Sequence, residues 1–304
     1  MEKKKSIWYY LYRDKWLYLM LVPVILYYFI FKYLPMGGIA MAFQDFNMFK
    51  GIFGSKFAGL SVFKKIFTQP QFWNSVKNTL ILNLLTLVVS FPFTIILSLI
   101  LNEIRCTWFK RLSQSLLYLP HFISWVVVAG IAVNLFSLNG GTVNNVLNVM
   151  GIKSIPFLSD KYWWIFTYVI CSVWKEIGWG TIIYLAALTG VDESLYEAAY
   201  LDGATRMQRI IYVTLPMVKP VIVTMLILSV SKMMTIGLDA PLLLGNSKVM
   251  EVSEVLSTYV YRLGIEKAQY SPATAVGLFQ SVVNIAILFM ADRFAKAIGE
   301  EGIL

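Results

Sequence analysis

The chain has 304 residues, of which 58% are hydrophobic and only 14% are charged. A soluble domain of this length does not need such an apolar share for its core, so the composition excludes an ordinary globular enzyme or binding module. The formal net charge of +9 would suggest a nucleic-acid partner in a soluble protein, but the basic residues here flank apolar runs, where anionic headgroups attract them. We therefore expect membrane lipid, and no nucleic acid, as a partner.

Six apolar runs are long enough to cross a bilayer, which takes roughly 20 residues. They cover about 16–35, 79–101, 115–137, 162–187, 216–238 and 272–293. Backbone groups in lipid must satisfy their own hydrogen bonds, so each run is predicted to be helical. The sequence therefore predicts an all-α integral membrane protein with six transmembrane helices, forming a single domain over residues 1–304.

The first run follows Lys3, Lys4 and Lys5, as the apolar part of a signal peptide would, and residues 40–42 offer a small-residue cleavage pattern. Its apolar stretch is longer than the roughly 7–15 residues of a cleaved signal, so we interpret it as a retained anchor. Basic residues are modestly enriched in the segments that this anchor would place inside, although the first outer loop opposes the trend. We expect both termini in the cytoplasm.

Small polar residues draw a stripe along the second run at spacings of three or four. A stripe of this kind could line a pore, but small hydroxyl residues also let helices pack closely, and we favour packing. The stripe comprises Thr79, Asn83, Thr86, Ser90, Thr94 and Ser98.

The third and fourth runs carry residues suited to a solute path, because aromatic rings stack on sugars and polar groups bind their hydroxyls. Charged residues inside a membrane are costly unless they face a cavity or a partner. Lys175 and Glu176 are adjacent and point about 100° apart, so we expect one of them to pair elsewhere. A buried ion pair that serves packing is an equal alternative. The candidates on these runs are His121, Trp125, Ser172, Lys175, Glu176 and Trp179.

His121 is the single histidine of the chain. A lone histidine is more often a structural hydrogen-bonding residue than a proton relay, and the sequence offers no Ser/His dyad, metal-ligand cluster or paired intramembrane carboxylates. We therefore expect no catalytic residue and no metal site.

Between the fourth and fifth runs lies a polar segment, residues 192–215, that lipid cannot accommodate. Apart from Gly203, its residues favour a short helix. Small residues would give this helix a smooth face, and Pro216 would end it and start the next span, where its missing N–H costs little. A solvated loop is the alternative. The residues singled out are Glu197, Ala198, Ala199, Asp202, Gly203, Arg206, Leu215 and Pro216.

The fifth run adds Ser229, Lys232 and Met233 to the candidate path. Beyond it lie residues 245–270, which we call the outer segment. Apolar residues recur there at helical spacing, which predicts an amphipathic helix lying at the membrane surface or inserting into a partner. They are Val249, Val252, Val255, Leu256, Tyr259 and Leu263.

The polar 192–215 segment resembles the motif of the membrane subunits of ABC importers: Glu-Ala-Ala, three residues, Gly, nine residues, a β-branched apolar residue, one residue and Leu-Pro. The chain has Val213 where that family usually has Ile. Strings along nearly the whole chain resemble the maltose-type carbohydrate permeases, above all the branch that imports complex oligosaccharides or polysaccharide fragments. These strings are residues 31–35, 102–104, 118–125, 178–180, 184–188 and 275–279.

The resemblance implies a type I ABC importer permease fold in a bacterial inner membrane, and a permease subunit that is not itself an enzyme. The implied partners are a second, related permease subunit, two ATP-binding cassette subunits, an extracytoplasmic sugar-binding protein and an oligosaccharide substrate. The sequence has no Gly-x-x-x-x-Gly-Lys-Ser/Thr loop, so we expect no cofactor on this chain, with ATP and Mg held by the partner ATPase.

The resemblance implies that the 192–215 segment, which we call the coupling segment, forms a helix from Glu197 to about Ile210 that sits in a cleft of the ATPase. Glu197 and Arg206 would make polar contacts there, Gly203 would allow close approach, and Pro216 would be the hinge to the fifth span. A secondary active transporter without an ATPase is the alternative function. It would normally need more spans or inverted repeats with broken helices, for which Pro92 and Pro120 are weak signals. The identity, length and charge of the sugar do not follow from the sequence.

Overall fold

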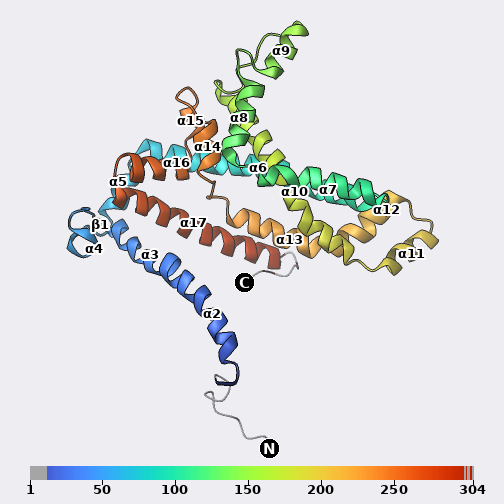
Figure 1. Cartoon of the computed structure of the whole chain (residues 1–304), viewed down its shortest axis with the longest axis horizontal. Coiled ribbons are helices and arrows are strands. Elements are labelled where there is room, and N and C mark those ends of the chain that lie inside the picture. The colour runs from blue at the N-terminus through green and yellow to red at the C-terminus, as the bar shows by residue number, and fades with distance from the viewer. Residues whose placement is uncertain (1–11, 298, 300–301, 303–304) are drawn as a thin grey trace, which may run out of the picture.

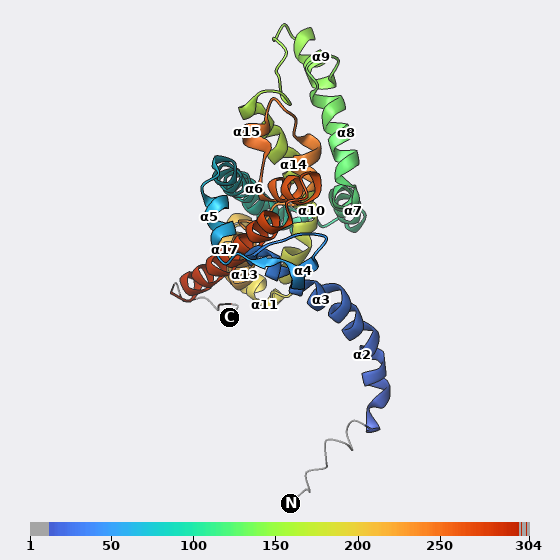
Figure 2. The same cartoon turned by 90° about the vertical axis from the view of Figure 1, so that its left-hand side faces the viewer.

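The protein is an elongated bundle of helices, seen in two orientations in Figures 1 and 2. The computed structural model describes residues 12–297, 299 and 302; Lys3, Lys4 and Lys5 of the anchor argument lie outside these residues. Five helices are long and apolar enough to cross a membrane, or six if one bent pair counts as a single span. This finding confirms the predicted all-α class.

The elements up to the second span are short except for the first helix. In chain order they are α2 (Lys15–Tyr28), a π turn (Phe29–Tyr33), α3 (Leu34–Met36), a 3₁₀ helix (Gly37–Phe43), β1 (Gln44–Asp45), α4 (Gly51–Gly54), β2 (Lys56–Phe57) and α5 (Ser61–Phe67). The two strands form a small antiparallel pair in which Gln44 lies opposite Phe57.

The remaining elements are helical. They are α6 (Pro70–Glu103), α7 (Thr107–Phe122), α8 (Trp125–Phe136), α9 (Thr142–Val149), α10 (Lys161–Thr189), α11 (Glu193–Leu201), α12 (Arg206–Arg209), a π turn (Ile210–Thr214), α13 (Leu215–Ser231), α14 (Asp239–Leu244), α15 (Met250–Ser253), α16 (Leu256–Tyr261), a π turn (Arg262–Glu266) and α17 (Tyr270–Ala297).

The first span is helical from Lys15 to Phe43, which makes it longer than predicted. It projects from the bundle in both views, and no residue of α2 is buried. The apolar surface of α2 is therefore left for lipid or for another chain to cover.

The third apolar run is not one helix, so the prediction of a continuous span over 115–137 is wrong. Helices α7 and α8 meet at an angle of 100°. The backbone between them is extended at Ile123 and Ser124, and the Ser124 hydroxyl accepts a hydrogen bond from the Val127 amide at the start of α8. This serine is an N-cap, which begins a new helix.

Helix α10 packs along α6 and α7, and two of its glycines make this approach possible. A Cβ at Gly178 would lie 1.8 Å from the Leu117 carbonyl oxygen, and a Cβ at Gly180 would lie 3.0 Å from the Thr94 methyl group. Thr94 and Ser98 are buried and bond to carbonyls of their own helix. These contacts support the packing interpretation of the small-polar stripe for the C-terminal half of α6.

The fifth span ends earlier than predicted. Its helix runs without interruption from Arg206 to Ser231, so the predicted range 216–238 is wrong at both ends. The non-helical backbone that follows is held by amide side chains: Asn83 donates to the carbonyl of Met233, and Asn284 accepts from the amide of Met234. Irregular backbone near a membrane needs partners of this kind.

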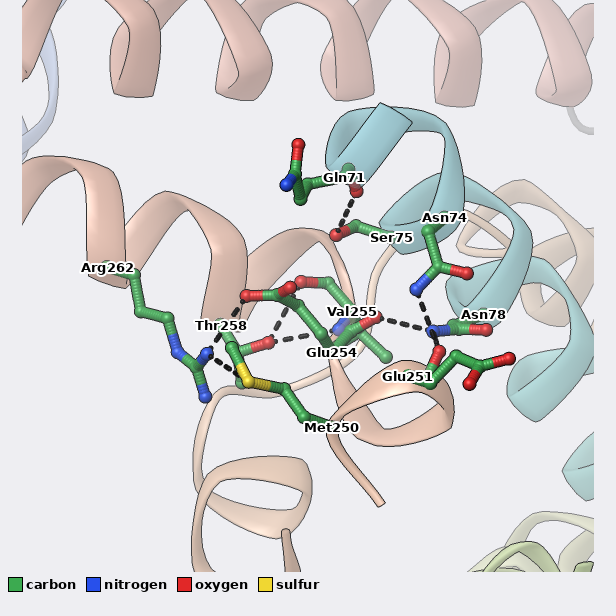
Figure 3. A network of polar contacts seen from close by, with 10 residues as sticks. All are labelled: Gln71, Asn74, Ser75, Asn78, Met250, Glu251, Glu254, Val255, Thr258 and Arg262. Atoms are coloured by element: carbon green, nitrogen blue, oxygen red, sulfur yellow. Dashed lines mark hydrogen bonds and ion pairs between the residues drawn. The ribbon is translucent and has the colours of Figure 1, made fainter. Parts of the chain in front are cut away.

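The outer segment is not one amphipathic helix at the membrane surface, so this prediction is also wrong. It forms two short helices and a π turn, and Val249, Val255 and Leu256 are completely buried within the chain. Figure 3 shows how α6 holds the segment: the Asn78 side chain donates to the carbonyls of Glu251 and Glu254. The apolar spacing therefore identified a buried face correctly, but that face packs on the chain's own core.

Candidate functional site

The coupling segment begins with a capped helix. The Asp192 side chain accepts a hydrogen bond from the Ser194 amide at 2.9 Å, which caps the first turn of α11. This bond lowers the pKa of the Asp192 carboxyl below its usual range, because it favours the ionised form. Helix α11 therefore has a defined start one residue after the polar segment begins.

Helix α11 ends at Leu201, two residues before Gly203, so the predicted single helix from Glu197 to Ile210 is wrong. Gly203 has a φ of +78°, and the amides of Gly203 and Ala204 bond back to the carbonyls of Tyr200 and Ala199. This pattern is a Schellman motif, which needs a left-handed residue and is most often closed by glycine. A Cβ at this position would meet nothing within 4 Å. Within the chain, the glycine is required by backbone conformation.

A second capping motif starts α12. The side chains of Thr205 and Gln208 bond reciprocally to each other's backbone amides, which is a capping box. The helix then continues through Pro216 into the fifth span without a break. Pro216 is therefore not a bend in this structure, and the change of direction lies at residues 202–205.

The α11–α12 hairpin lies at one end of the molecule (Figure 1) and carries large apolar side chains that are exposed. The exposed fractions are 69% for Tyr200, 85% for Leu201 and 64% for Met207. We call these three residues the hairpin patch. The Arg209 guanidinium lies 5.8 Å from the centre of the Tyr200 ring, so α11 and α12 are held together by a cation–π contact.

The sequence-selected residues of the coupling segment are placed around this patch. The exposed ones are Glu197, Ala198, Asp202, Gly203, Arg206 and Pro216, whereas Ala199 and Leu215 are half-buried. The motif therefore marks a largely solvent-facing surface. The structure leaves the charged and small residues of that surface free to meet another molecule.

A second group of residues gathers where α7 breaks and α10 crosses it. We call His121, Trp125, Lys175, Glu176 and Trp179 the central cluster. The Lys175 ammonium is buried, with 6% of the residue exposed, and donates to the His121 carbonyl at 2.5 Å and to the Pro120 carbonyl at 3.5 Å. The last carbonyls of a helix lack intrahelical partners and carry the negative end of its dipole. Lys175 thus caps the broken end of α7.

The other members of the central cluster lie on the more open side. Glu176 Oε2 is 2.8 Å from His121 Nδ1, and the Trp179 ring stacks on the imidazole at 4.5 Å with the planes 6° apart. Glu176 is half exposed at its side chain, in contrast to its neighbour, and its other oxygen lies 3.7 Å from the Lys175 amine. The two adjacent side chains therefore differ in burial, and both make contacts beyond their own ion pair.

A cavity of about 180 Å³ lies between α6, α10 and α13 and is lined in part by Glu176 and Ser229. From α6 it receives the polar groups of Ser90 and Thr94. The small-polar stripe was the signal that could have identified these two residues, although packing was the favoured interpretation.

Not every candidate path residue reaches this cavity. Ser172 is buried within the bundle, Lys232 is the exposed residue that follows the last turn of α13, and Met233 is half-buried beyond it. The Met233 carbonyl belongs to the turn that Asn83 holds. Of the candidate path residues, Glu176 and Ser229 line the cavity.

A model of the family described as "Binding-protein-dependent transport system inner membrane component" matches residues 66–300. Among curated proteins, the chain is 44% identical to the polygalacturonan/rhamnogalacturonan transport system permease protein YteP of Bacillus subtilis, covering 99% of this chain and 94% of that one. It is 43% identical to protein LplB of the same organism, covering 96% and 92%.

Solved structures agree. The chain matches a crystal structure of a bacterial ABC transporter involved in the import of the acidic polysaccharide alginate, with a TM-score of 0.88 and 38% identity over 97% of this chain and 99% of that one. It also matches a structure of a bacterial alginate ABC transporter in complex with an alginate pentasaccharide-bound periplasmic protein, with a TM-score of 0.89 and 37% identity, covering 98% and 100%.

Proposed function

The chain belongs to the family of binding-protein-dependent transport system inner membrane components, and we propose that it is one permease subunit of an ATP-driven importer of oligosaccharides. The observation that carries this proposal is the α11–α12 hairpin, which holds the family-type motif in a capped, solvent-facing form. Hydrolysis of ATP, with its Mg, takes place on two separate ATP-binding cassette subunits. A second, related permease forms the other half of the path.

The hairpin patch supports the docking of an ATPase. Tyr200, Leu201 and Met207 are mostly exposed, and large apolar side chains that gather on a surface commonly mark a protein interface. Glu197 and Arg206 flank them with opposite charges. The ATPase cleft would receive this surface, and closure of the two ATPases on ATP would favour one arrangement of the spans, in proportion to its differential binding.

The cavity between α6, α10 and α13 supports a solute path through the bundle. Glu176 and Ser229 offer acceptors and a hydroxyl to the groups of a sugar, and Trp179, which is 44% exposed, offers an aromatic face. Lys175 acts in this proposal as a positioning residue, because its amine is committed to the end of α7. The path residues that contact solute are therefore Glu176, Trp179 and Ser229.

The substrate class is drawn from the relatives. One is named for polygalacturonan and rhamnogalacturonan, and a structural match serves the import of the acidic polysaccharide alginate. Both names favour fragments of acidic polysaccharides. The Glu176 carboxylate on the cavity side makes charge the property of the substrate that is most informative to test.

An extracytoplasmic binding protein would deliver the substrate to the side of the outer segment, as a periplasmic protein accompanies the related alginate transporter. With both termini cytoplasmic, the hairpin lies on the ATPase side of the membrane. The whole assembly then resides in the bacterial inner membrane.

The experiment is affinity purification of the full chain from its own host, followed by identification of the co-purified subunits and measurement of ATP hydrolysis. We expect a second permease and an ATPase to be retained, with hydrolysis stimulated by the binding protein and oligosaccharide. Gly203→Asp should leave the chain inserted and abolish this stimulation. Solute accumulation by the purified chain alone, with no ATPase present, would instead establish a secondary transporter.

The path is tested with the same assembly, using oligogalacturonides, alginate oligosaccharides and neutral maltooligosaccharides as probes. Trp179→Ala should change uptake more than assembly, since its ring is 44% exposed and stacks on His121. Glu176→Gln should shift the preference between acidic and neutral probes, because it removes a negative charge that lines the cavity. Uptake kinetics identical to wild type in both variants would remove these residues from the path.

A further inference from the structure

Helix α11 is attached to the membrane bundle chiefly through one side chain. No residue of α11 is fully buried, and Tyr196 is its member that packs against the cluster at the cytoplasmic ends of the long helices. That cluster consists of Leu101, Leu185, Leu188, Val191 and Val218. Most residues that follow Tyr196 in the motif are exposed. A force on α11 therefore reaches the bundle at this ring, through the short connection to α10 at residues 190–192, or through the turn at Gly203.

The Tyr196 hydroxyl continues this attachment into the fifth span. It lies 3.0 Å from the hydroxyl oxygen of Thr214, a residue that is only 3% exposed. The Thr214 hydroxyl in turn donates to the Arg209 carbonyl at 3.3 Å. Since a threonine hydroxyl has a single proton, the tyrosine is the donor of the first bond. The result is a chain of two hydrogen bonds from α11 to the backbone at the base of α13.

The backbone that this chain reaches is irregular. Residues Ile210–Thr214 form a π turn between α12 and α13, and Thr214 is its last residue. Single π turns inside a helix are rare and occur often at functional sites, because they carry one extra residue per turn and can be rearranged without unfolding the helix. Tyr196 therefore bonds to a place in the fifth span where the backbone can change its length or rotation at small cost.

We propose that the hydrogen-bond chain Tyr196–Thr214–Arg209 is the link through which a displacement of α11 sets the conformation of the π turn and thereby the position of α13. This inference rests on the proposed function, since it takes the docked ATPase as the source of the displacement. Tyr196 and Thr214 are positioning residues, and neither is part of the hairpin patch. In this arrangement the displacement of α11 is transmitted through Tyr196, and the Gly203 turn only connects α11 to α12.

The test uses the complete assembly in nanodiscs with a reporter on α13. Ser229→Cys places a thiol on the cavity side of α13, and Cys106→Ser removes the exposed natural cysteine; all arms carry both changes. The variants are Tyr196→Phe, Thr214→Val and their combination. Tyr212→Phe is the matched control, because it removes the same hydroxyl from a side chain in the π turn that is 75% exposed. Maleimide labelling rates are measured with and without ATP and vanadate.

In the parent we expect ATP and vanadate to change the labelling rate. In Tyr196→Phe we expect this change to be about fivefold smaller, because one neutral hydrogen bond shifts an equilibrium by about that factor. Thr214→Val should have a similar effect, the double variant no larger one, and Tyr212→Phe none. The amount of co-purified ATPase should be equal throughout.

Full nucleotide response in Tyr196→Phe, or additive losses in the double variant, would overturn the link. A parent whose labelling ignores nucleotide would overturn it too, because α13 would then not respond to the ATPase. Failure of the proposed function gives a different result, since no ATPase would co-purify even with the parent chain.

Discussion

The outer segment and the coupling segment make opposite use of similar side chains. In the outer segment, Val249, Val255 and Leu256 are completely buried, and α6 holds the backbone through Asn78 (Figure 3). In the coupling segment, Leu201 is 85% exposed and Tyr200 69% exposed. The chain completes the first region by itself, whereas the second region is folded locally by caps and leaves its apolar residues for a partner.

Charges follow the same division. Glu254 is 7% exposed and lies 3.3 Å from the Arg262 guanidinium, so an outer charge is buried and paired. Glu197 and Arg206 in the coupling segment are exposed. Buried charges need a partner inside the chain, because removing them from water is costly. Exposed charges can find their partner on another molecule.

The largest expected effect separates the two regions with a matched pair of substitutions. Leu256→Ala should lower the free energy of unfolding by about 3 kcal/mol, because it opens a cavity in a packed core. Leu201→Ala, made as its match, should change that quantity by less than about 0.5 kcal/mol. It should instead weaken retention of the ATPase about tenfold if the leucine is an interface anchor. Thermal unfolding and co-purification measure the two quantities, and equal destabilisation by both variants would erase the contrast.

A smaller effect is expected from the buried pair. Arg262→Gln should destabilise the chain by about 1–2 kcal/mol at neutral pH, since it leaves Glu254 buried without its cation, although the arginine is partly exposed. Burial already raises the pKa of the Glu254 carboxyl above its usual range, and Arg262 opposes the rise. The folded state therefore takes up a proton at higher pH than the unfolded state does.

The deficit of this variant should shrink as pH falls through the raised pKa and should be fully relieved below the ordinary carboxyl value. Unfolding temperatures of variant and wild type at neutral pH and at about pH 5 give the comparison. Lys248→Gln, which changes an exposed charge of the same segment, is the control. A deficit that grows on acidification would contradict the assigned sign.

The smallest effect concerns the turn that shapes the coupling segment. Gly203→Ala should cost about 1 kcal/mol of hairpin stability, because a side chain disfavours the positive φ, whereas Gly203→Asn should cost less, since asparagine visits that region more readily. Hydrogen exchange at residues 199–205 reports the turn. If stimulated ATP hydrolysis is also reduced more by Gly203→Ala than by Gly203→Asn, the backbone conformation explains why a glycine is needed here. Loss of stimulation in Gly203→Asn with an intact turn would show that the ATPase needs the space.

Much of the fold could be predicted because long apolar runs have few structural options in a membrane. The spans at α6, α10 and α17 follow from their hydropathy alone. The break between α7 and α8 could not be predicted in this way, since both halves are apolar and only Ile123 and Ser124 leave the helical conformation. The outer segment was misassigned for a related reason, because a periodic apolar face does not say what covers it.

The candidate sites, like the fold, could be predicted only in part. The spacing around Gly203 identified the coupling segment but not its Schellman turn, since the motif is compatible with one helix or two. The sequence placed Lys175 and Glu176 on different faces, yet it could not decide which of them faces the solute path. Tyr196 and Thr214 carried no pattern that distinguishes them from other residues of the segment, because a hydrogen bond between residues 18 positions apart depends on how α11 folds back.

The sequence by itself determined that the chain is a membrane bundle built from long apolar runs, and that a polar segment between two of these runs resembles a docking motif, because hydropathy and residue spacing are local properties. Only the tertiary structure decided which charge is buried at the helix break, which apolar segment is covered by the chain itself, and where α11 is tied to α13. These outcomes depend on the distances between helices that are remote in sequence, and those distances are set by packing of the whole bundle.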